Sequence, residues 1–308
     1  MKICLTMTLG NDAETIEQCL HSVKPWIDRY LIVDTGSTDG SLEIAKRSLQ
    51  NLKGSILKAT SKAELLLLAK KEQGDYLLLI DPDERLSVTD RAGFGTLDRD
   101  CYYAISRENG IDWRKPFLLR SHLDWVGGEY LPQDLTSPQA RSAKLLFESI
   151  LWKIKSRAPE EKEKLKKALT LHPGSARLLF HYARMCEDAE ALQLFEKRAS
   201  MGGDQQEVFY SLYQVAVLRE KQGEPLEQVI DHYLKAYHFL PSRAEPLYDL
   251  SERMLREENY VLAYVLSEFA LTIARPEDPF LQKSWIYEHG LRRQFSEAAT
   301  HIKRRGAV

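Results

Sequence analysis

The sequence lacks the features that would place it outside a reducing, aqueous compartment. Its four cysteines, Cys4, Cys19, Cys101 and Cys186, are scattered, so no CxxC pair is present and no disulfide framework is predicted. The longest apolar stretches, 65–69 and 76–80, fall far short of the ~20 residues that a helix needs to span a bilayer. The first residues lack the apolar core and cleavage site of a signal peptide. We therefore expect a cytoplasmic protein without a transmembrane segment.

An excess of charge of either sign is also missing. The 308 residues carry 43 Lys and Arg against 45 Asp and Glu, which gives a formal net charge of −2. The basic runs 153–157 and 162–167 lie close to acidic residues, which is typical of a solvated helix face. Such a balance provides no global field to attract nucleic acid or an anionic membrane, so no nucleic-acid partner is predicted.

The length favours two domains, and the character of the sequence changes near residue 138. In residues 1–138, strand patterns alternate with helical patterns. The expected strands are 3–7, 30–33, 55–57 and 76–80, and the expected helices are 13–23, 41–49 and 62–71. Strands separated by helices indicate an α/β domain with a mostly parallel sheet and flanking helices.

Residues 139–308 have helical periodicity almost throughout, and a repeat is visible in them. Tyr233 and Ser267 are 34 residues apart, and so are Ala236 and Ala270. A period of 34 with small residues at helix crossings is typical of tetratricopeptide repeats. Because a single helix pair cannot bury its apolar face, neighbouring pairs stack into one continuous core. We therefore predict an all-α repeat domain that offers a surface for a protein partner.

Two acidic turns follow apolar strands in the α/β domain. Asp34 ends the first such strand, Gly36 permits a tight turn, and Asp39 stands before the next helix. Asp81 and Asp83 follow the most apolar strand. In parallel sheets, ligands bind outside the carboxyl ends of the strands. Two carboxylates there can hold Mn²⁺ or Mg²⁺, which would bind diphosphate oxygens and stabilise a departing nucleotide.

These motifs together resemble the family 2 glycosyltransferases of the GT-A fold. The resemblance is carried by 7–12, 33–39 and 81–84. The resemblance is closer still to the bacterial subgroup with C-terminal tetratricopeptide repeats. The repeat region of that subgroup is resembled by residues 243–248 and 259–264. The resemblance implies an inverting transfer of a sugar from a nucleotide-diphosphate donor to a protein, lipid-linked or polysaccharide acceptor.

The resemblance also implies roles for individual residues. The donor would be bound by Thr8, Asn11, Asp34, Gly36, Asp39 and Asp81, with Asp34 on the nucleoside. Asp81 and Asp83 would hold the metal ion. An inverting transfer needs a general base, and Glu129 is the first candidate because it matches the subgroup's glutamate. Asp124 and His122 are the alternatives.

Three departures from the subgroup leave a second hypothesis open. Gly10-Asn11-Asp12 replaces its Lys-Asn-Glu, 64–66 lacks its Arg-Asn, and 125–131 has no histidine before the glutamate. These losses favour a weakened or inactive relative that serves as a repeat-based interaction module. A third hypothesis is a pure repeat adaptor with a stabilising N-terminal domain. Lys62, Arg85 and Arg107 are candidates to supply the missing positive charge at the diphosphate.

Overall fold

The chain divides into two compact units in a computed structural model that describes residues 1–58, 62–69, 74–89, 97–127, 134–154 and 158–304. The units are Met1–Arg157 and Ala158–Val308. This division lies later than the boundary predicted at 138/139. The reason is that Ala143–Lys153 forms a long strand of the N-terminal sheet, although it ends where the basic run 153–157 begins.

The N-terminal unit is built on an eight-stranded sheet in the order β3-β2-β1-β4-β7-β6-β8-β5. Its first four strands are parallel, as expected, and the later part is mixed, with β7 antiparallel to both β4 and β6. In chain order, the strands are β1 Ile3–Leu9, β2 Arg29–Asp34, β3 Lys53–Lys58, β4 Tyr76–Leu79, β5 Glu84–Val88, β6 Cys101–Glu108, β7 Ile111–Arg120 and β8 Ala143–Lys153.

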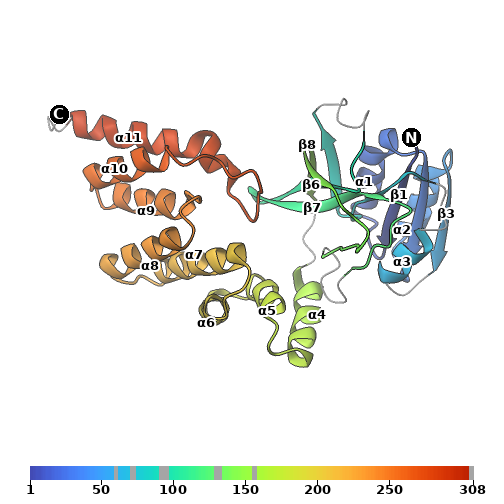
Figure 1. Cartoon of the computed structure of the whole chain (residues 1–308), viewed down its shortest axis with the longest axis horizontal. Coiled ribbons are helices and arrows are strands. Elements are labelled where there is room, and N and C mark those ends of the chain that lie inside the picture. The colour runs from blue at the N-terminus through green and yellow to red at the C-terminus, as the bar shows by residue number, and fades with distance from the viewer. Residues whose placement is uncertain (59–61, 70–73, 90–96, 128–133, 155–157, 305–308) are drawn as a thin grey trace. The chain divides into compact units, whose positions relative to one another are not determined.

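Helices cover both faces of this sheet (Figure 1). They are α1 Ile16–Val23, α2 Ser41–Leu49 and α3 Lys62–Ala69, with a 3₁₀ turn at Lys24–Trp26. Because side chains alternate along a strand, Leu5 packs in the core with α1 and α2, whereas Cys4 packs in the core with α3. The buried strands are therefore apolar on both faces, as is usual for parallel sheets.

The C-terminal unit consists of helices that stack side by side in chain order (Figure 1). They are α4 Ala158–Leu171, α5 Ala176–Ala183, α6 Asp188–Ser200, α7 Gln205–Lys221, α8 Leu226–Phe239, α9 Glu245–Arg256, α10 Tyr260–Ala270 and α11 Leu291–Arg304, with a π-helical turn at Ile286–Gly290. The predicted repeat positions Tyr233 and Ala236 on α8 and Ser267 and Ala270 on α10 are all buried. The helical-repeat architecture is therefore confirmed.

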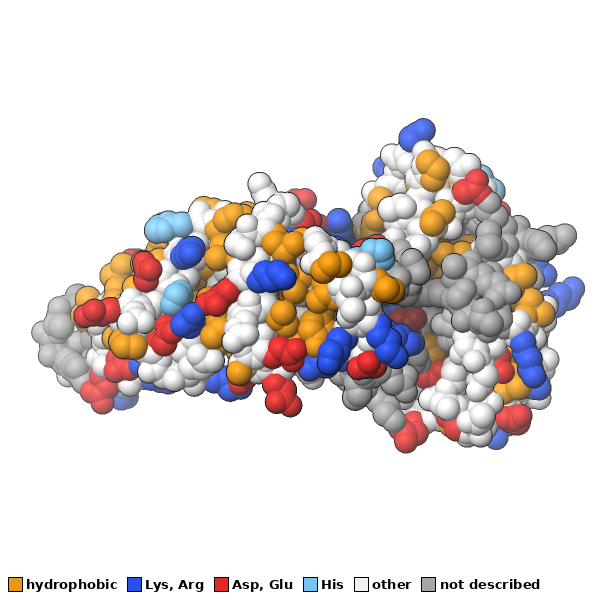
Figure 2. Space-filling model, turned by 90° about the horizontal axis from the view of Figure 1, so that it is seen from below, with side chains coloured by type: hydrophobic (Ala, Val, Ile, Leu, Met, Phe, Trp, Pro, Cys, Tyr) orange, Lys and Arg blue, Asp and Glu red, His pale blue; other side chains and the backbone are white. Residues whose placement is uncertain are grey.

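Acidic and basic side chains are interspersed with hydrophobic ones on the face of the helical unit seen in Figure 2. Separately, no helix among the described residues has both the length and the apolar character needed to cross a membrane.

Candidate functional site

The two acidic turns lie at the same edge of the sheet, at the carboxyl ends of parallel strands. β1 separates β2 from β4, with Leu9 paired to Asp34 and Thr6 paired to Leu79. Asp34 and Asp81 are therefore about 10 Å apart across the sheet, which corresponds to two strand spacings. Thr8 lies between them at the end of β1. The strand order thus brings the three residues to one edge.

Asp34 is buried and held by the turn that follows it. Its Oδ1 accepts hydrogen bonds from the backbone N–H of Ser37 at 2.9 Å and from the Ser37 hydroxyl at 2.5 Å, with the N–H of Gly36 at 3.3 Å. Burial opposes ionisation of Asp34, but these hydrogen bonds outweigh it and lower the pKa of the carboxyl. Among the described residues nothing donates to Oδ2, so this oxygen can accept from a ligand. Gly36 has a φ of 111°, which a residue with a side chain rarely adopts.

Asn11 and Asp39 join neighbouring loops of this edge. Asn11 Oδ1 accepts from the backbone N–H of Thr38 at 2.8 Å. Asp39 accepts from the N–H of Ala13 at 2.9 Å and from the N–H and hydroxyl of Ser41. The carboxylate of Asp39 is thus used within the protein, which fits a supporting role for the turn rather than direct contact with a donor.

The segment Asp81-Pro82-Asp83-Glu84 forms a tight turn between β4 and β5. The N–H of Glu84 donates to the carbonyl of Asp81 at 3.0 Å, and Pro82 occupies the second position, which proline favours in such turns. Because the chain reverses here, the carboxylates of Asp81 and Asp83 meet different strands. Asp81 reaches β7, and Asp83 reaches β8.

Lys115 on β7 is the partner of Asp81. Its ammonium lies 2.6 Å from Asp81 Oδ2 and 2.6 Å from Glu84 Oε2, and the Glu84 side chain is only 1% exposed. Burial would lower the pKa of Lys115, but the attraction of Asp81 and Glu84 outweighs it and raises the pKa. Lys115 therefore carries its charge throughout the neutral range.

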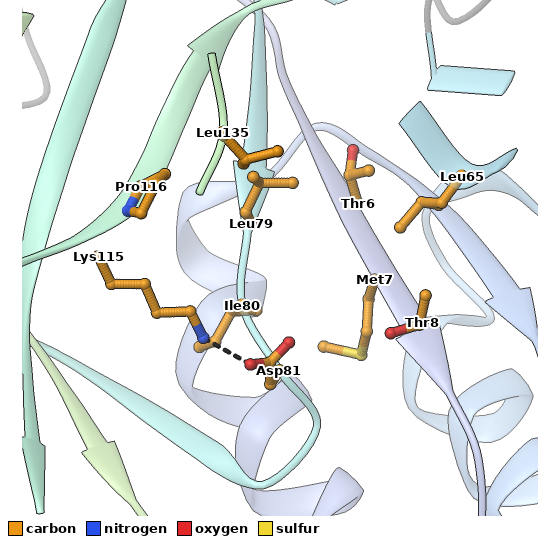
Figure 3. A pocket seen from close by; sticks show the side chains of 10 residues that line it. All are labelled: Thr6, Met7, Thr8, Leu65, Leu79, Ile80, Asp81, Lys115, Pro116 and Leu135. Carbon is orange, nitrogen blue, oxygen red and sulfur yellow. Dashed lines mark hydrogen bonds and ion pairs between the residues drawn. The ribbon is translucent and has the colours of Figure 1, made fainter. Parts of the chain in front are cut away.

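Figure 3 shows Asp81 between Lys115 and Thr8 in a pocket that Leu65 and Leu135 also line. The cavity volume is about 10 Å³, which is room for about one water molecule. A nucleotide sugar is far larger, so a bound donor would lie over the mouth of this pocket, along the edge that carries Asp34. The Asp81 side chain is 31% exposed and can be reached there.

Asp83 points into the protein. Its side chain is 2% exposed, and its Oδ2 lies 2.9 Å from the ammonium of Lys153 on β8. Burial raises the pKa of Asp83, with the ion pair to Lys153 opposing the shift. Asp83 is not among the residues that line the pocket.

The arrangement of Asp81 and Asp83 does not fit one divalent ion. Their carboxylates face different strands, and each has a lysine ammonium against one of its oxygens. Mg²⁺ requires nearly octahedral oxygen ligands at 2.0–2.1 Å. No group of three or more His, Cys, Asp or Glu side chains suited to a metal occurs within the described part of the chain. The metal ion thus stays a prediction from the sequence, and we derive no chemical step from it.

Of the predicted general bases, Asp124 and His122 do not line the pocket. Glu129 lies outside the residues that the structure describes. Asp124 pairs with Gln139, whose side-chain amide donates to Asp124 Oδ2 at 2.9 Å, and it does not line the pocket. His122 is exposed. The base therefore stays a prediction.

Of the predicted cations for the diphosphate, Arg85 and Arg107 do not line the pocket at Asp81 either. Arg107 forms two hydrogen bonds with the fully buried Asp112, and Arg85 is exposed on β5. The side chain of Lys62 lies outside what the structure describes. The sequence interpretation missed Lys115 and Lys153. The available signal for Lys115 was a lysine directly before the apolar run Pro116-Phe117-Leu118-Leu119.

Residues 5–90 match the family model described as glycosyl transferase family 2. A TPR repeat-containing protein of Synechococcus elongatus is 32% identical over 90 residues, which cover 28% of this chain and 21% of the relative. The chain therefore spans about a fifth of the length of this relative.

Among solved structures, S. aureus TarS is 13% identical, with a TM-score of 0.39 and coverage of 77% of this chain and 52% of that one. MamA is 13% identical, with a TM-score of 0.33 and coverage of 49% of this chain and 92% of MamA. These scores carry no argument about function. The matched range 5–90 includes both acidic turns, and the resemblance of the N-terminal unit to family 2 glycosyltransferases is confirmed.

Proposed function

We propose that the chain is a glycosyltransferase that takes a sugar from a nucleotide-diphosphate donor and transfers it with inversion. The observation that carries this proposal is the placement of Asp34, Thr8 and Asp81 along one edge of the sheet, within the region that matches family 2. Asp34 accepts a hydrogen bond from the nucleoside at Oδ2, because Oδ1 already accepts hydrogen bonds from Ser37 in the turn. The diphosphate lies toward Asp81 and Lys115.

The roles left to other residues follow from this placement. Asn11, Gly36 and Asp39 keep the loops beside Asp34 in position. The base that removes the acceptor proton is Glu129 or Asp124, and the acceptor is a protein, a lipid-linked sugar or a polysaccharide. The predicted Mn²⁺ or Mg²⁺ is kept only as a condition of the turnover assay, because the carboxylates of Asp81 and Asp83 do not fit one ion. The helical repeats select or present the acceptor, or bind a protein partner.

A second function is favoured by one observation. Lys115 and Lys153 neutralise the acidic motif internally, which is also what a relative without catalysis would show. Such a protein would act through its helical repeats, with the N-terminal unit retained as a scaffold.

Turnover separates the two functions. The full chain is incubated with a panel of nucleotide sugars, with Mn²⁺, Mg²⁺ or EDTA, and release of the nucleoside diphosphate is measured with and without candidate acceptors. The proposal expects release with at least one donor, and loss of at least ~100-fold in Asp34→Ala but not in Glu43→Ala, an exposed acid on α2. Absence of release from every donor, with intact binding of a protein partner, favours the second function.

A further inference from the structure

A lysine occupies the place where the sequence predicts a metal ion. The ammonium of Lys115 lies between the carboxylates of Asp81 and Glu84, at 2.6 Å from each. These distances are those of strong, charge-assisted hydrogen bonds. The side chain is 10% exposed and is anchored in β7, so it is part of the built floor of the pocket.

The positions of the charges explain why a divalent ion is disfavoured at Asp81. The motif carries three carboxylates, Asp81, Asp83 and Glu84, and two ammonium groups, Lys115 and Lys153, each within 3 Å of a carboxylate oxygen. A divalent ion on Asp81 would lie beside the Lys115 ammonium and would be repelled by it. Asp83 cannot help to hold such an ion, because it faces Lys153.

The two carboxylates that pair with Lys115 differ in exposure. Glu84 is 1% exposed and keeps Lys115 in place, whereas Asp81 is 31% exposed and borders the pocket. Asp81 is therefore the partner that a ligand can replace. An ammonium group can donate to a phosphate oxygen in place of a carboxylate oxygen without a change in its own geometry.

We infer that Lys115 is the cation that binds the donor diphosphate, and that a phosphate oxygen displaces Asp81 from it without a divalent ion. This inference rests on the proposed function. Asp81 then opposes binding in the empty site, because it competes with the diphosphate for Lys115 and adds a negative charge beside it. A metal-dependent site would give Asp81 the opposite role.

Two substitutions with opposite expected effects test the inference. Binding of UDP, GDP and dTDP to the full chain is measured by calorimetry in EDTA and in Mn²⁺, for the wild type, Asp81→Asn and Lys115→Met. Wild-type binding is expected in EDTA, with Mn²⁺ improving it less than about threefold. Lys115→Met is expected to lose at least tenfold in EDTA. Asp81→Asn is expected to bind at least as tightly as the wild type.

The reverse pattern overturns the inference. If the wild type binds only in Mn²⁺ and Asp81→Asn abolishes binding, the site is metal-dependent, while the proposed function stands. If no nucleotide binds under any condition, the inference and the proposed function both fail. Thermal melts check that each variant is folded, and Asp81→Asn alone still decides between the two roles if Lys115→Met does not fold.

Discussion

At the scale of single residues, the turn after β2 holds the Asp34 carboxylate in place. One carboxylate oxygen is bonded to Ser37 and Gly36, and the other has no donor among the residues that the structure describes. Charge-assisted hydrogen bonds of this kind favour the ionised form, which is why the pKa of Asp34 is lowered. The side chain is thus held in one orientation and one charge state before any donor binds.

The effect of Ser37 can be measured directly. A carboxyl with a lowered pKa stabilises the fold above its unfolded pKa of ~3.9, and this stability is lost as the pH falls through the folded value. Ser37→Ala removes one of the hydrogen bonds, so the pKa of Asp34 should rise toward its ordinary value. Carbon NMR of the carboxyl during a pH titration measures it, with Ser48→Ala as the control. An unchanged pKa would contradict the role given to Ser37.

Residue patterns in the sequence predicted one turn better than the other. The Asp34 carboxylate accepts its hydrogen bonds from Gly36 and Ser37, within three residues along the chain, so a local pattern was sufficient. The partners of Asp81 and Asp83 come from β7 and β8, more than thirty positions further along the chain. Spacing alone suggested that the two carboxylates converge. The turn at Pro82 separates them, and only the pairing of distant strands reveals this.

At the scale of elements, a buried ion pair connects helices of the repeat unit. Arg243 is 1% exposed and donates to Glu245 on α9, to Gln206 on α7 at 2.9 Å and to the carbonyl of Phe280 at 3.0 Å. It therefore connects two helices to the segment before α11.

Alternating strand and helix patterns predicted the parallel strands, and the 34-residue period predicted the repeats. Ala143–Lys153 was missed because it ends in a basic run.

Loss of this arginine should destabilise the helical unit. Arg243→Ala leaves Glu245 buried without its charged partner, which typically costs about 3–5 kcal/mol. Urea unfolding followed by far-ultraviolet circular dichroism measures the free energy of unfolding. Arg292→Ala, an exposed arginine on α11, should change it by less than ~0.5 kcal/mol. Equal effects of the two substitutions would show that the buried network does not hold the helices together.

At the scale of the whole molecule, the chain consists of two units with separate cores. The core of the N-terminal unit is formed by the sheet and α1 to α3, and that of the C-terminal unit by helices alone. In the proposed function, donor binding is assigned to Met1–Arg157, and selection of an acceptor or partner is assigned to the repeats. The acceptor could not be inferred from the sequence, because repeat helices share their buried positions and differ in their exposed ones.

Calorimetric titration of the full chain with a panel of nucleotide sugars tests the central claim most directly. We expect at least one donor to bind with a stoichiometry of one. We also expect Asp34→Asn to weaken that binding by at least tenfold, because a hydrogen bond to a charged group contributes about 1.5–3 kcal/mol. Glu43→Gln should leave it unchanged. Absence of binding by every donor, or equal binding by Asp34→Asn, would contradict a donor site at this edge of the sheet.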